Sequence, residues 1–551
     1  MRATDQIARW AHRGLLYLLL TAGAIVFAWP LAWMLLASIK TEREFSNPAA
    51  GVLPAAPRPR RQSPYVDGSR FAGPATASGR AVLAAIERQL RAAPTAWPAA
   101  VDPDQMTVAV ARGLFQHLRL SQPAAWWRQA PAALAASLPR LIGDREVAET
   151  QAQVERSLLL GNLTATADDL TQDVLAPPDR EAGTWQIGGP AAARFTAPLP
   201  GLPAGRLQYD FSSGDRVQLT RTFTTTFPVS RLRRLQVFLR ADASWNRLYA
   251  TVEMDGRQYR AERPITLADD NWSEATWQRP SADDQSNQLR TWILWREVAH
   301  GPQFATDPHQ IKITLEIVRS GWLRAWWEKI TQNYQQTLNY IPFWRYVATS
   351  VFLVILQLVG TLFSCSLVAY SFARLRWPGR RLCFLLMIAT MVVPSQVTMI
   401  PHFLIMRALG WYNTLYPLWT GSLLANAFFV FLLHQFLRGL PRDLEDAARI
   451  DGCSYWQIYW HVVLPLIRPS LAAIAIFTFI GAWNDFTGPL LFVSDQRLYP
   501  LSFGLYALNV QSGGTTTIMM AGSLLMTLPV IVLFLFAQRY FIEGITFTGM
   551  K

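Results

Sequence analysis

The sequence predicts an α-helical polytopic membrane protein with six transmembrane helices and a large α+β extracytoplasmic insert, which we expect to include a β-sandwich. Of the 551 residues, 51% are hydrophobic and only 16% are charged. Residues 41–340 hold 34 of the 51 Lys and Arg and 30 of the 38 Asp and Glu. The remaining residues form uncharged runs long enough to cross a hydrocarbon layer, which takes about 20 residues. This composition excludes a purely soluble enzyme, a disordered chain and a collagen-like fibre.

The first predicted span is an uncharged run at residues 14–39, which follows Arg2, Arg9 and Arg13. The run is too long for the core of a signal peptide and lacks a clear cleavage site, so we expect an uncleaved anchor. Residues 1–45 are therefore predicted to form a cytoplasmic N-terminus and the first transmembrane helix.

Five more uncharged runs follow the insert. They lie at about residues 346–373, 382–406, 415–437, 469–491 and 516–538. Arginines cluster after the second span and between the fourth and fifth, whereas the opposite short loops hold only Arg407 and Arg497. This bias places both termini in the cytoplasm and residues 41–340 outside it, in a bacterial-type plasma membrane. The net charge of +13 is thus attributed to topology and membrane lipid, and no nucleic-acid partner is expected.

The insert, residues 46–325, divides into two patterns. Residues 48–64 are rich in Pro, Arg and Ala and resemble a linker, and a helical part is predicted at about 80–175, including 81–90, 108–120 and 154–160. Alternating runs predict strands at about 205–320, namely 217–223, 235–239, 248–254 and 311–317. Asp255-Gly256 follows the third run and predicts a hairpin turn. Short strands at this spacing favour a β-sandwich.

The tryptophans of the insert have two possible roles, and the cysteines of the chain predict no metal site. The tryptophans could stack on sugar rings or fill the sandwich core, and core filling is the favoured alternative; they are Trp245, Trp272, Trp277, Trp292 and Trp295. All three cysteines (Cys365, Cys383 and Cys453) lie outside the insert, which excludes an internal disulfide there. No cysteine pair has metal-ligand spacing, so no metal is predicted.

The cytoplasmic loop at residues 438–468 predicts a helix–turn–helix outside the membrane. Pro441 suits a first helical turn, acids follow it near the positive end of the helix dipole, and Gly452 supplies a stop. Ser454 and Gln457 form a capping box for a second helix that we expect to end at Pro465. Its apolar face is expected to be exposed and to need a partner; the residues of that face are Tyr455, Ile458, Tyr459 and Val462.

This loop resembles the coupling loop of binding-protein-dependent ABC importer permeases. The family pattern is Glu-Ala-Ala, three residues, Gly, nine residues and Ile-x-Leu-Pro. Here the matching residues are Asp446, Ala447, Ala448, Gly452, Val462, Leu464 and Pro465, with Glu445 directly before them. Asp replaces the usual Glu, which leaves open whether Glu445 or Asp446 pairs with the ATPase. The resemblance implies that all eight residues dock the ATPase.

The resemblance extends to the sugar-transport branch, the second permease subunit of maltose-type importers. It rests on Ile341-Pro342-Phe343, on residues 369–375, on Pro394-Ser395-Gln396 and on residues 482–486. It covers residues 1–45 and about 325–551, so residues 326–551 are expected to form a type I ABC importer permease core with five transmembrane helices. The family's first external loop is much shorter, and no role for the insert is implied.

The resemblance implies the partners and the mechanism. A second permease subunit, two ATPase subunits and an extracytoplasmic solute-binding protein are expected, with a carbohydrate as substrate. None of the four lysines follows a glycine, so the chain has no Gly-Lys-Ser/Thr phosphate loop. We therefore expect no enzyme activity and no cofactor on this chain, with ATP and Mg²⁺ held by the separate ATPase subunits.

Four polar residues in the predicted spans are candidates for a translocation pathway. Gln396 and Asn426 could hydrogen-bond a sugar, although such residues more often link helices. Asp485, beside Asn484, is either a functional intramembrane acid or a helix-terminus acid that orders the outer loop, and the sequence leaves both open. Pro394, Pro401 and Pro489 are expected to kink the spans.

Two other functional classes remain as alternatives. One is a membrane-anchored glycan-binding sensor or adhesion protein, which would not need six spans. The other is a proton-coupled carrier using Asp485, which would not need the coupling loop. A membrane enzyme is disfavoured because neither His-Glu-x-x-His nor Gly-x-Ser-x-Gly occurs in the sequence.

Overall fold

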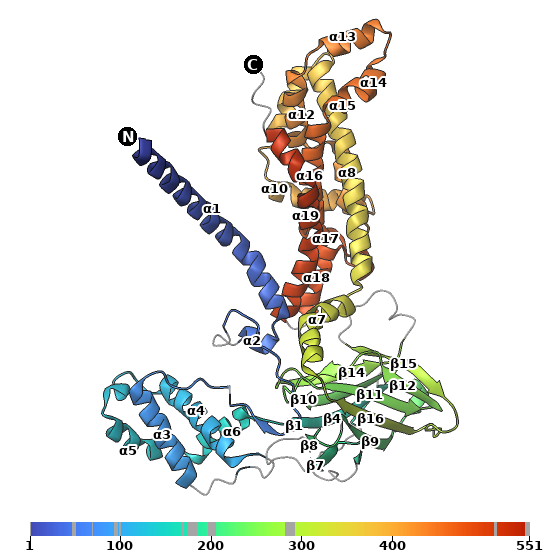
Figure 1. Ribbon diagram of the computed structural model, residues 1–551. Coiled ribbons are helices and arrows are strands. Elements are labelled where there is room, and N and C mark those ends of the chain that lie inside the picture. Colours follow the sequence, from blue (N-terminus) through green and yellow to red (C-terminus); the bar gives the residue numbers. More distant parts are fainter. Residues whose placement is uncertain are drawn as a thin grey trace. The chain divides into compact units, whose positions relative to one another are not determined.

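The computed structural model describes residues 2–46, 51–68, 70–92, 97, 101–167, 170–173, 185–196, 205–280, 292–511 and 515–545. The chain divides into two compact units (Figure 1). The membrane unit contains Met1–Pro54 and Thr331–Lys551, and the insert unit contains Ala55–Ser281 and Thr291–Ile330. We describe each unit by itself.

All the secondary structure in the described residues of the membrane unit is helical. Its elements are α1 (Arg2–Ile39), α2 (Glu42–Ser46), the second half of α7 (Trp322–Tyr340), α8 (Phe343–Arg374), α9 (Arg380–Thr390), α10 (Ser395–Ala408), α11 (Tyr416–Trp419), η6 (Thr420–Leu424), α12 (Ala427–Gly439), α13 (Asp443–Ile450), α14 (Tyr455–Ile458), the π-helix η7 (Tyr459–Val463), α15 (Leu464–Leu466), α16 (Arg468–Trp483), α17 (Thr487–Phe492), η8 (Gln496–Leu498), α18 (Leu501–Gln511) and α19 (Thr516–Ile545). Polar groups join α8 to the segment before α12, because Gln357 Nε2 donates to Leu418 O at 2.8 Å and Ser364 Oγ donates to Ser422 O at 2.8 Å.

Two of the predicted spans are not single straight helices. By length and composition, four helices among the described residues could cross a membrane, and the count reaches six only if each of two bent pairs forms one span. The span predicted at 382–406 breaks between α9 and α10, which differ in direction by 101°. Pro394 explains this break, because it disfavours the helical conformation of the residue before it. The span predicted at 469–491 breaks after Trp483, and a 76° bend precedes α16, where Pro469 occupies the first turn.

The first part of the insert unit is a small helical layer, as the sequence predicted. It consists of α3 (Ala77–Ala92), α4 (Pro103–Ser121), η2 (Trp126–Arg128), α5 (Pro131–Leu141) and α6 (Asp144–Val154). Helix α4 begins at an Asp102 cap with Pro103 in its first turn. The apolar faces of these helices share one core, which includes Val82, Ile86, Met106, Leu114, Leu118, Leu134 and Leu138.

The helical prediction fails after Val154. Residues 155–167 and 170–173 are the strands β3 (Glu155–Arg156), β4 (Leu158–Ala167) and β5 (Leu170–Asp173), so the helix predicted at 154–160 and the helical boundary near 175 are wrong. Leu158, Leu159 and Leu160 are at most 4% exposed, so both faces of β4 are covered at these positions. A short, fully buried apolar run carries no periodicity that separates a strand from a helix.

The second part of the insert unit is a large, mostly antiparallel sheet. The other strands are β1 (Gln62–Ser63), β2 (Tyr65–Val66), β6 (Gln186–Gly188), β7 (Ala192–Thr196), β8 (Gly205–Asp210), β9 (Arg216–Thr224), β10 (Arg234–Arg240), β11 (Arg247–Met254), β12 (Arg257–Ala261), β13 (Ile265–Thr266), β14 (Trp272–Gln278), β15 (Ile293–His300) and β16 (Gln310–Val318), with the short η4 (Val229–Arg231) between β9 and β10. The four strands predicted from alternation are confirmed as β9, β10, β11 and β16. The predicted hairpin is confirmed between β11 and β12, where Asp255 and Gly256 have φ of 55° and 66°.

The β-sandwich itself stays a prediction. Among the described residues, fourteen strands form one sheet, and eleven of them follow the order β1-β8-β4-β10-β14-β15-β12-β11-β16-β9-β6. The other three, β5, β7 and β13, pair with β4, β8 and β11. The two antiparallel halves of the sheet are joined by a short parallel pairing of β14 and β15. Both halves contribute to one apolar core, with Leu235 and Val237 from β10 and Ile313 and Leu315 from β16.

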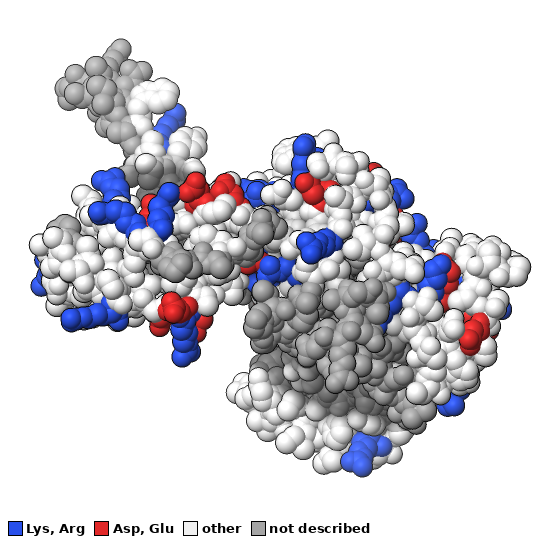
Figure 2. Space-filling view, turned by 90° about the horizontal axis from the view of Figure 1, so that it is seen from below, with Lys and Arg blue, Asp and Glu red and all other residues white. Residues whose placement is uncertain are grey.

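Two of the five insert tryptophans, Trp277 and Trp295, belong to the apolar core of the sheet. Trp277 and Trp295 are fully buried in the core, which confirms the favoured alternative for these two residues. Trp245 is also buried, whereas Trp272 is half-buried and stacks on Phe238 at 4.7 Å. The molecular face seen in Figure 2 carries both Lys or Arg and Asp or Glu in scattered positions, as expected of a water-exposed surface.

We expect Trp277→Ala to destabilise the insert by about 3–5 kcal/mol, because the substitution leaves a large cavity in a fully buried core. Pulse proteolysis of the detergent-solubilised full chain across a urea series measures this as a lower midpoint for cleavage within the insert. Val298→Ala is the control, since Val298 is 58% exposed on β15. Equal midpoints for the two variants would contradict the assigned core.

Candidate functional site

The loop at residues 438–468 forms the hairpin that the sequence predicts. Helix α13 ends at Ile450, and Gly452 follows at φ +83° with its N–H donating to Arg449 O at 3.0 Å. The capping box is confirmed: Ser454 N–H donates to Gln457 Oε1 at 2.8 Å, and Gln457 N–H donates to Ser454 Oγ at 3.3 Å. A turn with φ > 0 at Gly452 therefore joins α13 to a second short helix that begins with a capping box.

The second helix of the hairpin continues one residue beyond the predicted end. Its backbone runs through α14, the π-helix η7 and α15, which ends at Leu466. Pro465 lacks the N–H that would bond to His461 O, and the N–H of Leu464 instead reaches Tyr459 O. Pro465 thus widens the helix before the bend at Ile467 rather than ending it.

Two of the four residues of the predicted apolar stripe face inward, which corrects the prediction of an exposed stripe for these two; Val462 is half-buried, and Tyr455 is 58% exposed as predicted. Ile458 and Tyr459 are at most 1% exposed and pack in the core formed by α8 and α12. The Tyr459 hydroxyl lies 2.7 Å from Ser366 Oγ of α8. Periodicity identified the correct face, but it could not indicate which surface that face meets.

Tyr455 and other exposed residues form the outer surface of the hairpin, which we call the docking face. Its large exposed members are Leu444, Ile450, Tyr455, Trp456 and Trp460, with exposed fractions from 42% to 87%. Asp446, Ala447 and Gly452 are also exposed on the hairpin, whereas Ala448 is buried and Val462, Leu464 and Pro465 are half-buried. Exposed aromatic and apolar side chains beside small residues indicate a surface that contacts another protein.

A buried ion pair holds the hairpin on the membrane unit. Arg374, the last residue of α8, lies 2.9 Å from Glu445 Oε1, and both side chains are at most 7% exposed. Arg374 Nη2 also donates to Leu437 O at 2.6 Å and to Leu440 O at 2.9 Å. Burial raises the pKa of Glu445 above its usual value, and Arg374 opposes that rise.

The two acids of the family motif therefore occupy different environments. Glu445 points into the membrane unit, while Asp446 is exposed and lies 3.3 Å from Arg449. The role of Arg374 was missed, because its position after an apolar span was fully explained by topology. The available signal was an arginine at the end of one span, Arg374, together with two adjacent acids in a later loop, Glu445 and Asp446.

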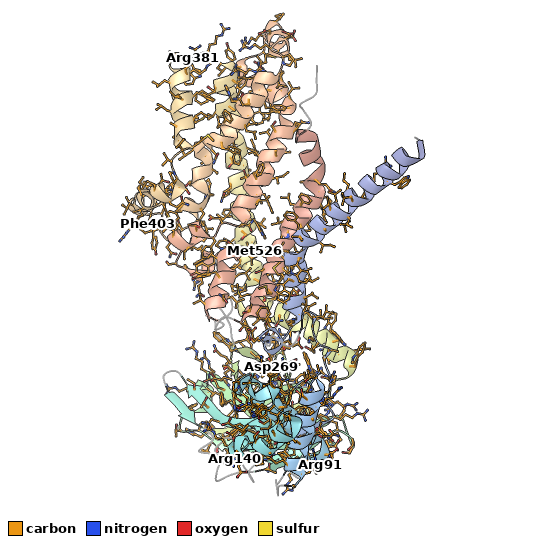
Figure 3. The ribbon with its side chains drawn as sticks, turned by 90° about the vertical axis from the view of Figure 1, so that its left-hand side faces the viewer. Arg91, Arg140, Asp269, Arg381, Phe403 and Met526 are labelled. Atoms are coloured by element: carbon orange, nitrogen blue, oxygen red, sulfur yellow. The ribbon has the colours of Figure 1, made fainter. Side chains whose placement is uncertain are left out.

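A second candidate site is a cavity of about 770 Å³ within the membrane unit. Gln396 and Asp485 both line it, together with Ser395, His402, Pro417 and Thr487. Phe403, labelled in Figure 3, stacks on the lining residue Phe492 with ring centroids 6.0 Å apart. Asp485 Oδ1 accepts the N–H of Gly488 at 3.0 Å, and this bond holds the carboxylate at the start of α17.

The other two pathway candidates do not line this cavity. Asn426 caps α12 by accepting the N–H groups of Phe428 and Phe429 at 3.0 and 3.3 Å. Asn484 donates to Ile480 O at 3.0 Å and closes the end of α16. The cavity therefore brings together two of the four predicted pathway residues, Gln396 from α10 and Asp485 from the segment between α16 and α17.

We expect Arg374→Gln to loosen the hairpin by about 3–5 kcal/mol, because Glu445 would remain buried without its cation. Hydrogen exchange at residues 443–466 measures the effect as a loss of amide protection. Glu445→Gln should cost at least as much, because Arg374 would then be buried without its carboxylate and a guanidinium cannot lose its charge. Arg376→Gln, at an exposed position, is the control; protection unchanged in Arg374→Gln would contradict the role of the pair.

Comparisons with known proteins match the membrane unit. The family described as binding-protein-dependent transport system inner membrane component matches residues 365–546. An arabinooligosaccharides transport system permease protein of Halalkalibacterium halodurans is 37% identical over 209 residues, which cover 38% of this chain and 75% of that protein. A diacetylchitobiose uptake system permease protein of Streptomyces coelicolor is 34% identical over 217 residues, which cover 39% of this chain and 71% of that protein.

A solved structure covers a similar share of the chain. It is the crystal structure of a bacterial ABC transporter involved in the import of the acidic polysaccharide alginate, with 28% identity and a TM-score of 0.35 over 38% of this chain and 79% of that chain. The sequence relatives carry the assignment, because they exceed 30% identity over more than two thirds of their own length. The chain belongs to the family of binding-protein-dependent transport system inner membrane components, the permeases of ABC importers.

Proposed function

We propose that the chain is the transmembrane permease subunit of an ATP-driven, binding-protein-dependent carbohydrate importer. In this proposal it forms the translocation pathway with a second permease subunit, couples to two separate ATPase subunits and receives solute from an extracytoplasmic binding protein. Relatives named for arabinooligosaccharides and diacetylchitobiose support a carbohydrate substrate. The observation that carries the proposal is the α13–α14 hairpin, which buries Ile458 and Tyr459 in the permease while its docking face remains exposed.

The docking face suits an ATPase partner. Ala447 and Gly452 leave room for close approach, and Trp456 and Trp460 provide large apolar contact area. Of the two acids, Asp446 is our candidate for the ion pair with the ATPase, because Glu445 is already paired inside the permease. Glu445 then acts as a positioning residue that fixes α13 to the end of α8.

We also propose the topology given by the arginine bias. In this topology α9 with α10 counts as one span and α16 with α17 as another, and the hairpin before α16 stays outside the membrane. This gives six spans, cytoplasmic termini and an extracytoplasmic insert with a sandwich-like sheet part. Arg381, at the start of α9, lies at the same end of the membrane unit as the α13–α14 hairpin (Figures 1 and 3). Basic residues gathered at that end support its assignment to the cytoplasmic side.

The cavity lined by Gln396 and Asp485 is our candidate for the solute pathway in this subunit. A carboxylate and an amide can each bind sugar hydroxyls, and a mostly apolar cavity of this size between helices, with a few polar groups, is a common place for a ligand. Asn426 and Asn484 support the helix ends around it. A proton-coupled carrier would also need an acid such as Asp485 in its pathway. The experiment must therefore distinguish uptake driven by ATP from uptake driven by a proton gradient.

Gly452→Val is expected to abolish solute-stimulated ATP hydrolysis while the chain stays in the membrane. A β-branched residue at φ +83° costs roughly 1–2 kcal/mol of backbone strain, which would displace the turn of the hairpin. Gly452→Asn should retain more activity, because Asn tolerates this conformation. The assay is ATPase activity of the complete importer in proteoliposomes. Full stimulation in Gly452→Val would count against docking through the hairpin.

Asp485→Asn is expected to raise the KM for uptake about tenfold or more, since a charge-assisted hydrogen bond to a sugar hydroxyl is worth about 1.5–3 kcal/mol. Asp495→Asn is the matched control, because Asp495 caps η8 and does not line the cavity. Uptake is measured in proteoliposomes driven by ATP alone or by a proton gradient alone. Uptake driven by the gradient without ATP would overturn the proposal in favour of a carrier.

A further inference from the structure

One face of α10 forms part of the wall of the cavity that contains Gln396 and Asp485. Ser395, Thr398, His402 and Ile405 follow each other at spacings of three, four and three residues, which places them on one side of this helix. The described lining residues whose side chains can form hydrogen bonds are Ser395, Gln396, Thr398, His402, Asp485 and Thr487. The rest of the described lining is mostly apolar, so each polar group has a large influence on what can bind.

Asp485 supplies the fixed charge of this lining. Among the described residues that line the cavity there is no Lys or Arg, and Asp485 is the only Asp or Glu. Its carboxylate interacts with the backbone N–H groups of Thr487 and Gly488, and no described Lys or Arg forms an ion pair with it. An acid at membrane depth without a cationic partner indicates a functional role.

Three features of the structure hold this carboxylate at the cavity wall. The carbonyl oxygen of Asp485 accepts a hydrogen bond from Ser502 Oγ at 2.6 Å, and Oδ1 accepts the N–H of Gly488 at 3.0 Å. Gly488 also leaves room for Oδ2, because a Cβ there would lie 2.5 Å from Oδ2 and 3.1 Å from Leu418 Cδ2. The negative charge therefore has one defined place in the lining.

We propose that Asp485 makes the cavity selective for the charge of the solute. The cavity admits carbohydrates without an anionic group and excludes sugars that carry a carboxylate or a phosphate. This inference rests on the proposed function, in which the cavity belongs to the solute pathway. It adds the charge class of the solute, which the assignment to carbohydrate transport leaves open because sugars occur in neutral, acidic and amine-bearing forms.

The selectivity follows from what each class of sugar meets in the cavity. A neutral sugar can donate a hydroxyl to Asp485 and accept a hydrogen bond from the amide of Gln396. An anionic sugar meets the carboxylate without a compensating cation among the described lining residues. At a separation of about 6 Å and a protein-like dielectric, this repulsion lowers affinity roughly 100-fold. An ammonium group on an amino sugar is attracted by the same carboxylate.

Charged thiol reagents measure the potential in the cavity without any transport. Thr487→Cys places a thiol in the lining, in a background that also carries Cys383→Ser and Cys453→Ser. Cys365 is retained, because it is fully buried. The permease–ATPase complex in nanodiscs, without a binding protein, is treated with a cationic or an anionic methanethiosulfonate reagent, and the two reaction rates are compared.

Asp485→Asn is expected to lower the ratio of cationic to anionic reaction rates about tenfold or more. An Asn side chain can still accept the N–H of Gly488, so the turn is retained. The matched control is Asp495→Asn, since Asp495 caps η8 and does not line the cavity. The comparison is repeated with His402→Gln, which removes the other titratable group of the described lining.

Protection of the same thiol tests the solute directly. Arabinotriose and diacetylchitobiose serve as neutral probes and trigalacturonate as the anionic probe, with an uncharged methanethiosulfonate reagent as the label. A neutral probe is expected to slow the labelling of Thr487→Cys while Asp485 is present. Trigalacturonate is expected to slow it only after Asp485→Asn.

A rate ratio unchanged by Asp485→Asn, or equal protection by trigalacturonate with and without Asp485, would overturn the charge selectivity. A change in the ratio that disappears in His402→Gln would overturn it in favour of the histidine. Failure of all three probes to protect the thiol would remove the cavity from the solute pathway, and the selectivity with it. Coupling through the α13–α14 hairpin is measured by ATP hydrolysis and is unaffected by these results, so the two proposals fail separately.

Discussion

The ion pair between Arg374 and Glu445 is the contact on which the α13–α14 hairpin depends. A guanidinium buried at the end of a span must have its donors satisfied, and Arg374 uses the carboxylate of Glu445 together with Leu437 O and Leu440 O. These groups belong to α13 and to the end of α12. One side chain thus fixes three helix ends to each other, so a force applied to α13 would reach two spans rather than a flexible loop.

The breaks in the apolar helices obey the same requirement that buried polar groups have hydrogen-bond partners. Backbone that leaves the helical conformation at membrane depth is tolerated only where protein or a polar cavity satisfies it. After α16 ends at Trp483, the carbonyl of Asp485 accepts Ser502 Oγ at 2.6 Å and its carboxylate accepts the N–H of Gly488. A Cβ at Gly488 would approach Asp485 Oδ2 to 2.5 Å, so only glycine leaves the carboxylate in this position. The break and the acid in the cavity are therefore one arrangement.

Short-range sequence patterns predicted correctly those elements whose structure depends on residues close together in the chain. Alternation in β9, β10, β11 and β16 reports one buried face, and the Ser454–Gln457 box and Gly452 act within a few residues. The errors have a different origin. Leu158–Leu160 is buried on both faces, so its pattern had no period, and Tyr459 lies on a face whose partner is α8, almost one hundred residues earlier in the chain. Arg374 and Glu445 are likewise paired over a distance in sequence that no local pattern encodes, and the cavity at Asp485 depends on helix breaks.

The side chain of Asn333 on α7 also explains how a permease can carry so large an insertion. The last carbonyls of a helix lack partners within it, and Asn333 satisfies those of Ser38 and Lys40 at the end of α1. Lys40 in turn donates to Gly51 O at 2.7 Å. The chain therefore leaves α1 and returns through α7 at points held together by hydrogen bonds, as is required where a domain is inserted between two fixed ends. Because this closure uses only residues at the two ends, the length and fold of the segment between them can vary without changing the membrane helices.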